Sequence, residues 1–549
     1  MLVFLLIQVR SVQVYAGHKV AEYLSSKLNT TVEIGSVDIE FFKKVVLEDI
    51  YIEDLHQDTL LYSKKIKIDI SKLDFEKHQL FVSSVMLLNT KSKLINYAKE
   101  DDLNLQFIID LFIDNDTTKK KPSQRWEIKF DEITLVNTDF TYRSENDTLE
   151  TTGVNYFDLN VRKVNGRITD IQFEQDTIRA TIDYLSAIEK SGFGLQNFSS
   201  YVNVSPVGIK LDELKIKTSE STISTDLSFK YKGYRAFKDF INQVKIKAEF
   251  NKSNLELSDI AYFAPQLKGI YRNITISGKI TGKVSDLKGK DMDLKLAPNT
   301  EFIGDVTLTG LPKIDETLIY LNVEKLTTNY SDLKDIPIPP FENHKRLSVP
   351  SNLAKLGKMN FKGTFTGLYN DFYAYGDFSS ALGNLSSDLS VRHDVEKDKA
   401  VYKGKLKSRS FDFGKFFDAE LLGKATMDVN IDGEGFTLED VAAKLTGNIK
   451  TVEFNNYTYQ NVAIEGNIAK QIFKGKLNVK DENIDFDFIG DVDFTGKLPK
   501  LDFITTLNKA NLTALQFVKS DKKMELSTQL LINVTGNTCL LYTSPSPRD

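Results

Sequence analysis

The alternation of apolar and polar residues in short runs, from about residue 31 to residue 534, most constrains what this chain can fold into. Residues 66–70 read Ile-Lys-Ile-Asp-Ile, and residues 484–488 read Ile-Asp-Phe-Asp-Phe. Because successive residues of a strand point to opposite faces, each run predicts a strand with one apolar and one polar face. The persistence of the pattern predicts a very long, one-sided β-surface.

Composition supports a folded, β-rich chain. Its 549 residues are 41% hydrophobic, which is enough to bury a core. The net charge of -5, from 71 basic and 76 acidic residues, excludes a general attraction to nucleic acid. Only 12 prolines are present, as long hydrogen-bonded ladders require.

The last residues break the strand pattern abruptly. The chain's single cysteine, Cys539, opens the stretch CLLYTSPSPRD, which is similar to a translated sequencing adapter. We therefore interpret residues 539–549 as an assembly artefact and expect the native chain to continue beyond them. With one cysteine there is no internal disulfide framework.

The first residues contain a short apolar run. Six residues are too few to cross a bilayer, which needs about 20. A signal-peptide core and the start of a buried helix are alternatives, but no basic segment precedes the run. We favour the remnant of a transmembrane anchor, formed by Leu2, Val3, Phe4, Leu5, Leu6 and Ile7.

A coarse pass along the chain predicts one long helix over residues 12–28, because Val20, Leu24 and Leu28 recur at helical spacing. Strands are expected at 32–41, 45–52, 60–70 and 81–94, and short helices at 103–112, 234–241, 257–263 and 411–417. The predicted organisation is an anchor remnant (1–10), a helix with a β-meander (11–113), a linker (114–123), two β-rich groove segments (124–340 and 341–538), and the adapter-like tail (539–549).

Two pairs of segments resemble each other. Residues 85–90 (VMLLNT) align with residues 133–138 (ITLVNT), and residues 306–315 resemble residues 492–502. Repeated strand-turn units predict an array that grows by adding strands. The irregular spacing favours a long meandering sheet over a strict solenoid.

No catalytic, cofactor or metal site is indicated. The five histidines show no metal-ligand spacing, and residues 278–283 (GKITGK) match a phosphate loop only superficially. Asp485 and Asp487 share the polar face of one strand, so they are interpreted as solvated charges rather than an acid-base pair. We therefore expect a protein that is not an enzyme and has no cofactor.

A continuous apolar face must be covered by helices, by a second sheet, by lipid, or by curling on itself. The predicted helices are too few to cover the face. β-sandwiches in tandem are one alternative. The other is a curled sheet whose apolar trough suits acyl chains, which need little directional bonding.

The chain also resembles the TamB/AsmA-like proteins of Bacteroidota. The resemblance is carried by residues 31–39 (TVEIGSVDI), 47–54 (LEDIYIED), 58–61 (DTLL), 262–267 (YFAPQL) and 457–462 (YTYQNV). These are strand and turn motifs, and they extend over nearly the whole chain. The C-terminal domain expected of the family is missing.

The resemblance implies an N-terminal fragment of an inner-membrane-anchored, single-pass periplasmic protein of a Gram-negative bacterium. It would serve outer-membrane biogenesis by carrying phospholipid along the groove, by assisting outer-membrane protein assembly, or both. Its partners would be phospholipid, the inner membrane and an outer-membrane assembly protein.

The alternative function is an extracellular β-sandwich adhesin or scaffold. The fold expected is an elongated, curled antiparallel sheet with an N-terminal helix and few short helices. The candidate groove residues are Ile66, Ile68, Ile70, Ile128, Phe130, Ile484, Phe486 and Phe488.

Overall fold

The computed structural model describes residues 9–40, 43–74, 76–112, 127–147, 153–174, 176–394, 399–437, 440–518 and 522–535. The anchor residues 2–7, the linker and the adapter-like tail therefore lie outside the described residues, whereas Arg10, the last residue of the predicted anchor remnant, already begins a helix. The described chain divides into two compact units: unit 1 holds Met1–Gly289 and Pro340–His344, and unit 2 holds Lys290–Pro339 and Lys345–Asp549.

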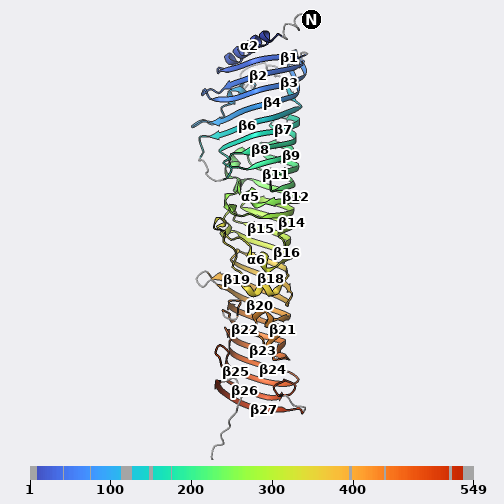
Figure 1. Ribbon diagram of the computed structural model, residues 1–549, viewed down its shortest axis with the longest axis vertical. Helices are drawn as coiled ribbons and strands as arrows, with labels where there is room; N and C mark the ends of the chain where they lie inside the picture. The colour runs from blue at the N-terminus through green and yellow to red at the C-terminus, as the bar shows by residue number, and fades with distance from the viewer. Residues whose placement is uncertain are drawn as a thin grey trace, which may run out of the picture. The chain divides into compact units, whose positions relative to one another are not determined.

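Unit 1 is a curled ladder of strands beside which a few helices lie (Figure 1). Its strands are β1 (Val32–Glu40), β2 (Lys44–Glu53), β3 (Thr59–Asp74), β4 (Gln79–Asn96), β5 (Glu127–Phe130), β6 (Glu132–Ser144), β7 (Asp158–Glu174), β8 (Thr177–Glu189), β9 (Gly194–Ser205), β10 (Gly208–Lys217), β11 (Thr222–Lys230), β12 (Lys245–Glu256) and β13 (Asn273–Lys283). Its helices are α2 (Arg10–Leu28), α3 (Gln106–Phe112), η1 (Tyr234–Asp239), α4 (Phe240–Gln243), α5 (Leu257–Ala261), η2 (Pro265–Leu267) and η4 (Phe341–Asn343).

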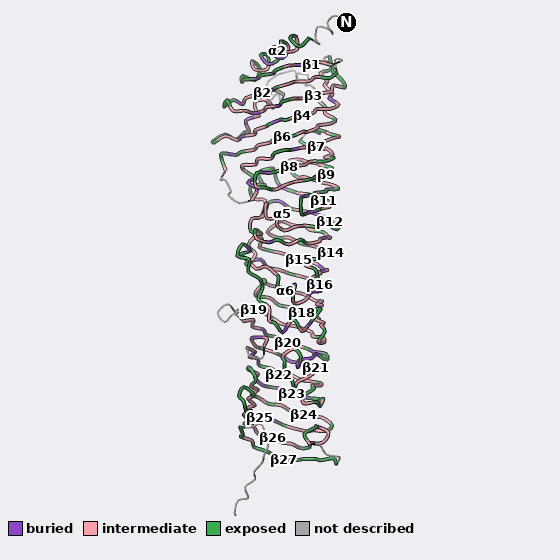
Figure 2. Tube along the Cα trace, viewed as in Figure 1, coloured by how far each residue is buried: buried purple, intermediate pink, exposed green. Residues whose placement is uncertain are grey.

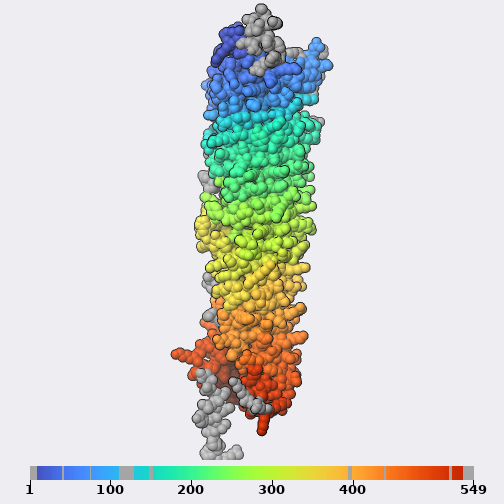
Figure 3. All heavy atoms as spheres, turned by 45° about the vertical axis from the view of Figure 1, so that its right-hand side comes forward, coloured from blue at the N-terminus to red at the C-terminus, as the bar shows by residue number. Residues whose placement is uncertain are grey.

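Unit 2 repeats the architecture, and the strand β14 (Asp286–Ala297) runs across the division. Its other strands are β15 (Thr300–Thr309), β16 (Leu318–Thr328), β17 (Met359–Gly367), β18 (Asp371–Ser380), β19 (Gly383–Asp394), β20 (Lys399–Asp412), β21 (Leu422–Glu434), β22 (Ala442–Phe454), β23 (Tyr457–Ala469), β24 (Ile472–Lys480), β25 (Ile484–Asp493), β26 (Lys500–Asn511) and β27 (Glu525–Thr535). Its helices are η3 (Ile314–Glu316), α6 (Tyr330–Lys334), η5 (Ser351–Leu356) and α7 (Phe413–Phe417). Within each unit, the colour bands of Figure 3 follow one another in chain order.

The predicted fold class, mostly β with a curled, largely antiparallel sheet and an N-terminal helix, is confirmed. One local exception is a parallel pairing of β4 with β5 and β6. The connection that contains α3 carries the chain back to the same end of the sheet, and only such a crossover permits parallel neighbours. The two similar segments predicted from sequence are these parallel partners, because Val85 lies opposite Ile133 and Leu88 opposite Val136.

The long helix α2 lies along β1. Gly17 allows this approach, because a Cβ atom there would lie 3.2 Å from the carbonyl oxygen of Ile34. Ala21 and Leu28 pack with Val32 in the same cluster. The helix ends at Asn29, whose left-handed backbone (φ 54°) is a conformation that asparagine tolerates.

Several strands of unit 1 carry a residue in the left-handed backbone region. Such residues occur at Asp49, Asn89, Asn137, Lys163, Asp170 and Glu213, and the register of neighbouring strands shifts beside the last four. The residue that follows is buried at each of these positions except Asp170, where it is half-buried. Figure 2 shows the distribution of buried and exposed residues along the strands. β-bulges of this kind bend strands and increase twist. The bulges on β6, β7 and β10 therefore contribute to the curl of the sheet.

Candidate functional site: the apolar face of the sheet

The apolar residues predicted on β3 lie on one face of the sheet, as alternation requires. Ile66 is opposite Leu47 on one side and Leu87 on the other. Ile68 is opposite Val45 and Val85. Each of these positions therefore belongs to a row of apolar side chains that runs across the strands.

Two such rows cross unit 1. The Leu47 row crosses β2 to β11 and consists of Leu47, Ile66, Leu87, Leu135, Gly166, Leu185, Phe198, Ile216 and Ile223. The Val45 row crosses β2 to β8 and consists of Val45, Ile68, Val85, Ile133, Ile168 and Ile182. With strands about 4.8 Å apart, the eight steps of the Leu47 row cover roughly 38 Å. The chains of one bilayer leaflet reach about 15 Å, because the hydrocarbon core is about 30 Å thick.

The apolar side chains of both rows are half-buried. Toward one end of the strands the same face is more open, where Phe173 is 59% exposed and Ile178, directly opposite, is 44% exposed. Ile178 shares a face with Ile182 by strand alternation. A second packed layer would bury such side chains. The apolar face of unit 1 is therefore partly accessible along these rows and most open at Phe173 and Ile178.

The opposite face of the same strands carries ion pairs. Lys65 binds Glu48 across 2.8 Å, and Arg167 binds Glu132 across 2.9 Å. The hydrogen bond from Lys65 lowers the pKa of the Glu48 carboxyl. The sheet of unit 1 is therefore one-sided, as the sequence predicts.

The first strands of the face are covered. Phe107 and Ile108 of α3 pack with the cluster formed by α2 and β1, which also contacts Val45 and Leu47. The accessible part of both rows consequently begins beyond β2.

Two predicted groove residues lie on the short strand β5. Ile128 is opposite Leu80, although its side chain lies outside the described part of the structure, and Phe130 is half-buried opposite Val82. Ile70 is half-buried and also lies opposite Val82. Ile70 and Phe130 therefore flank one residue of β4.

In unit 2 the predicted residues are packed more tightly. Ile484 and Phe488 of β25 are buried, with 8% and 5% exposure, and Phe486 is half-buried. Ile484 belongs to a cluster with Leu515, which lies after β26. The centre of the Phe488 ring lies 4.9 Å from the centre of the Phe503 ring. This part of the apolar face is a closed core.

The turn after β2 holds a buried carboxylate that sequence reasoning did not single out as a site residue. Asp54 is fully buried and accepts hydrogen bonds from Tyr97 Oη and Asn104 Nδ2, both at 2.8 Å, and from the backbone N–H groups of His56 and Asp58. Burial alone would raise the pKa of Asp54, but these hydrogen bonds together lower it. The network fixes the chain at one end of β2 and β3, and it gives Asp54 of the 47–54 motif a structural role.

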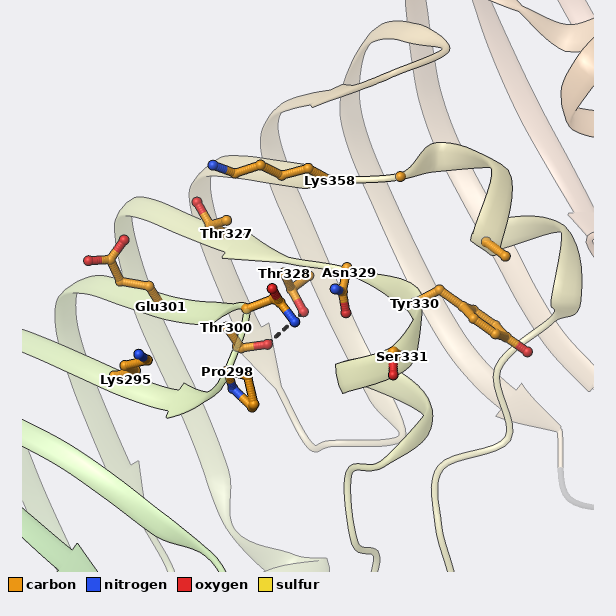
Figure 4. A pocket seen from close by; sticks show the side chains of 13 residues that line it. Lys295, Pro298, Thr300, Glu301, Thr327, Thr328, Asn329, Tyr330, Ser331 and Lys358 are labelled. Carbon is orange, nitrogen blue, oxygen red and sulfur yellow. Dashed lines mark hydrogen bonds between the residues drawn. The ribbon is translucent and has the colours of Figure 1, made fainter.

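Unit 2 also contains an open recess of about 690 Å³ beside α6 (Figure 4). In the figure, Lys295, Glu301 and Lys358 lie on the side away from Tyr330, and Thr300 is joined to Thr328 by a hydrogen bond of 2.9 Å. Glu301 is paired with Lys325 at 2.5 Å, which lowers the pKa of its carboxyl. Thr300 and Glu301 in this lining are thus held by structural contacts.

Two further observations concern only the residues that the structure describes. No group of three or more histidine, cysteine, aspartate or glutamate side chains is arranged to hold a metal ion there. No helix in that part of the chain combines the length and the apolar character needed to cross a membrane.

The fold and the site define a class of protein: a one-sided, curled β-sheet with an accessible apolar face. Comparison of the chain with protein-family models, curated proteins and solved structures found no match.

Proposed function

We propose that the protein binds the acyl chains of phospholipids along the apolar face of unit 1. The observation that carries this proposal is the pair of half-buried apolar rows, of which the Leu47 row continues over roughly 38 Å and the Val45 row over roughly 24 Å, backed by a charged face. An acyl chain gains free energy by leaving water for such a surface, at about 25 cal/mol for each Å² buried. The rows contact an acyl chain through apolar side chains without fixed polar partners. They therefore suit a ligand that moves along the sheet.

The broader role we propose is that of a periplasmic protein, anchored in the inner membrane, which supplies lipid or assists protein assembly for the outer membrane. It is supported by the resemblance of residues 31–61 and 262–267 to TamB/AsmA-like proteins. We propose no catalytic activity for the chain. Its partners in this role are phospholipid, the inner membrane and an outer-membrane assembly protein.

Site-specific photocrosslinking tests the lipid-binding proposal. The full chain carries benzoylphenylalanine at Ile133, on the Val45 row, or at Thr134, the next residue and therefore on the opposite face. After illumination in cells, mass spectrometry detects covalently attached phospholipid. We expect adducts at position 133 and not at position 134.

Two results would contradict the proposal. One is labelling at neither position in a folded protein, as an adhesin or scaffold would give. The other is equal labelling at both positions, which indicates nonspecific contact with membranes.

A further inference from the structure

The helix α2 presents a face to solvent that the packing against β1 does not use. Tyr15 is 63% exposed and Tyr23 is 62% exposed. Lys19 and Lys27 alternate with these tyrosines at four-residue spacing, so the four side chains follow one stripe of the helix.

This stripe points away from the sheet. At 100° per residue, Lys19 lies about 180° from Leu28 around the helix axis. Leu28 is buried against β1, together with Gly17 and Ala21. The helix therefore has one side fixed to the protein and the other free to lie on a surface, over a length of about 28 Å.

The lysines and tyrosines of the stripe are associated. Lys19 Nζ is 5.8 Å from the centre of the Tyr15 ring, and Lys27 Nζ is 6.0 Å from the centre of the Tyr23 ring. Each lysine stem thus lies near an aromatic ring with its ammonium group beside the ring. Val12 and Ala16 on the same side are half-buried and add apolar area near the Tyr15 ring.

The charge of α2 favours an anionic partner. The helix carries Arg10, Lys19 and Lys27 against a single acidic residue, Glu22, whereas the whole chain has a net charge of -5. Glu22 accepts a hydrogen bond from Lys19 across 2.7 Å. The excess of positive charge is therefore local to this helix.

We infer that the Tyr15–Lys27 stripe of α2 binds an anionic phospholipid surface. Tyrosine rings favour the boundary between headgroups and acyl chains, and lysines keep an apolar stem at that depth while the ammonium group meets phosphate. Protein interfaces are instead depleted of lysine at their centres. The inference does not require lipid carriage by the apolar face, since α2 uses residues outside both rows.

Tryptophan fluorescence of the full chain tests this inference. The single tryptophan, Trp126, is replaced by phenylalanine, and one probe is introduced as Tyr23→Trp. The matched control is Tyr201→Trp in the same background, because Tyr201 is 53% exposed on the charged face of unit 1. With phosphatidylcholine vesicles containing phosphatidylglycerol, we expect a blue shift of the probe at position 23 and none at position 201.

Charge removal gives a second readout. Lys19→Gln and Lys27→Gln should each weaken partition onto the anionic vesicles about fivefold, the effect expected for one lysine near such a surface. The control variants Lys215→Gln and Lys217→Gln remove exposed charges from β10 and should leave partition unchanged. Circular dichroism verifies that all variants are folded.

Several outcomes would overturn the inference. One is a chain that sediments with vesicles while the probe at position 23 stays unshifted, because other residues then make the contact. Another is an equal shift at positions 23 and 201. A third is a probe at position 23 that shifts when a soluble protein is added but not when anionic vesicles are added. An Ile68→Asp variant should keep the shift, so a failure of lipid carriage and a failure of α2 binding give different results.

Discussion

The side-chain amide of Asn137 donates a hydrogen bond to Oδ1 of Asn89 across 2.7 Å. Both residues are left-handed, with φ of 51° and 48°, and they occupy the same position in two similar segments that pair in parallel. The backbone N–H of Asn137 also donates to Oδ1 of Asn165 on the next strand. Asparagine therefore has two roles here. Its backbone tolerates the left-handed conformation, and its side chain makes hydrogen bonds to residues of neighbouring strands.

This relationship predicts an order of stability at position 89. Asn89→Ala places a side chain without local polar partners in the left-handed region, which costs about 1–2 kcal/mol, and removes a hydrogen bond worth about 1 kcal/mol. Asn89→Gly loses the hydrogen bond but not the backbone tolerance. Urea unfolding should therefore show a larger loss for Ala than for Gly. Equal losses would indicate that the backbone conformation is not what asparagine provides.

Much of the sheet follows from the sequence. Alternation locates β3 and β25, and the repeated Asn-Thr pairs mark two of the bends. Lys163 and Glu213 occupy left-handed positions at equivalent bends without any local signal, because the tertiary curl imposes that conformation on residues that rarely adopt it. The sequence predicts the five-residue helices α5 and α7 but not α6, which has the same length.

The sequence also could not distinguish an open face from a closed one. Ile68 and Phe488 occur in runs with the same alternation, yet Ile68 is half-buried and Phe488 is 5% exposed. Burial depends on what crosses the face, such as Leu515 near β25, and strand periodicity contains no such information. The buried Asp54 is equally invisible, because its partners Tyr97 and Asn104 are distant in the chain.

That difference predicts different roles for the two residues. Phe488→Ala should reduce the free energy of unfolding by about 3–5 kcal/mol, since it empties a packed position. Ile68→Ala should cost less, because its side chain already contacts solvent, and Ile68→Asp should keep the fold while abolishing phospholipid adducts at position 133. Equilibrium unfolding and the crosslinking assay measure the two effects. Retention of adducts in folded Ile68→Asp would place lipid elsewhere.

Acid should weaken the turn held by Asp54. All four hydrogen bonds at this carboxylate are donated to it, so the amide of Asp54→Asn would place an N–H group against other donors. We expect Asp54→Asn to cost about 1.5–3 kcal/mol at neutral pH. The pKa of Asp54 is lowered by folding, so its stabilisation is present above the unfolded pKa, about 3.9, and is lost as the pH falls through the lower folded pKa.

Urea unfolding of the wild-type chain and Asp54→Asn, followed from neutral pH to below pH ~3, checks this dependence. The stability difference between the two proteins should narrow at the acid end. A difference that is constant over the whole range would show that ionisation of Asp54 is not the stabilising factor.

The facing glycines Gly363 and Gly376 permit a close approach of β17 and β18 in unit 2. A Cβ atom at Gly363 would lie 2.1 Å from the carbonyl oxygen of Tyr375, a distance that the backbone must shift to avoid. Gly363→Ala should therefore lower the free energy of unfolding by about 1–3 kcal/mol or more, as overpacking does. The matched control is Gly194→Ala on β9, where an added Cβ meets no atom within 4 Å and the change should stay within about 0.5 kcal/mol. Urea unfolding measures both variants, and a neutral Gly363→Ala would mean that β17 and β18 can separate at little cost.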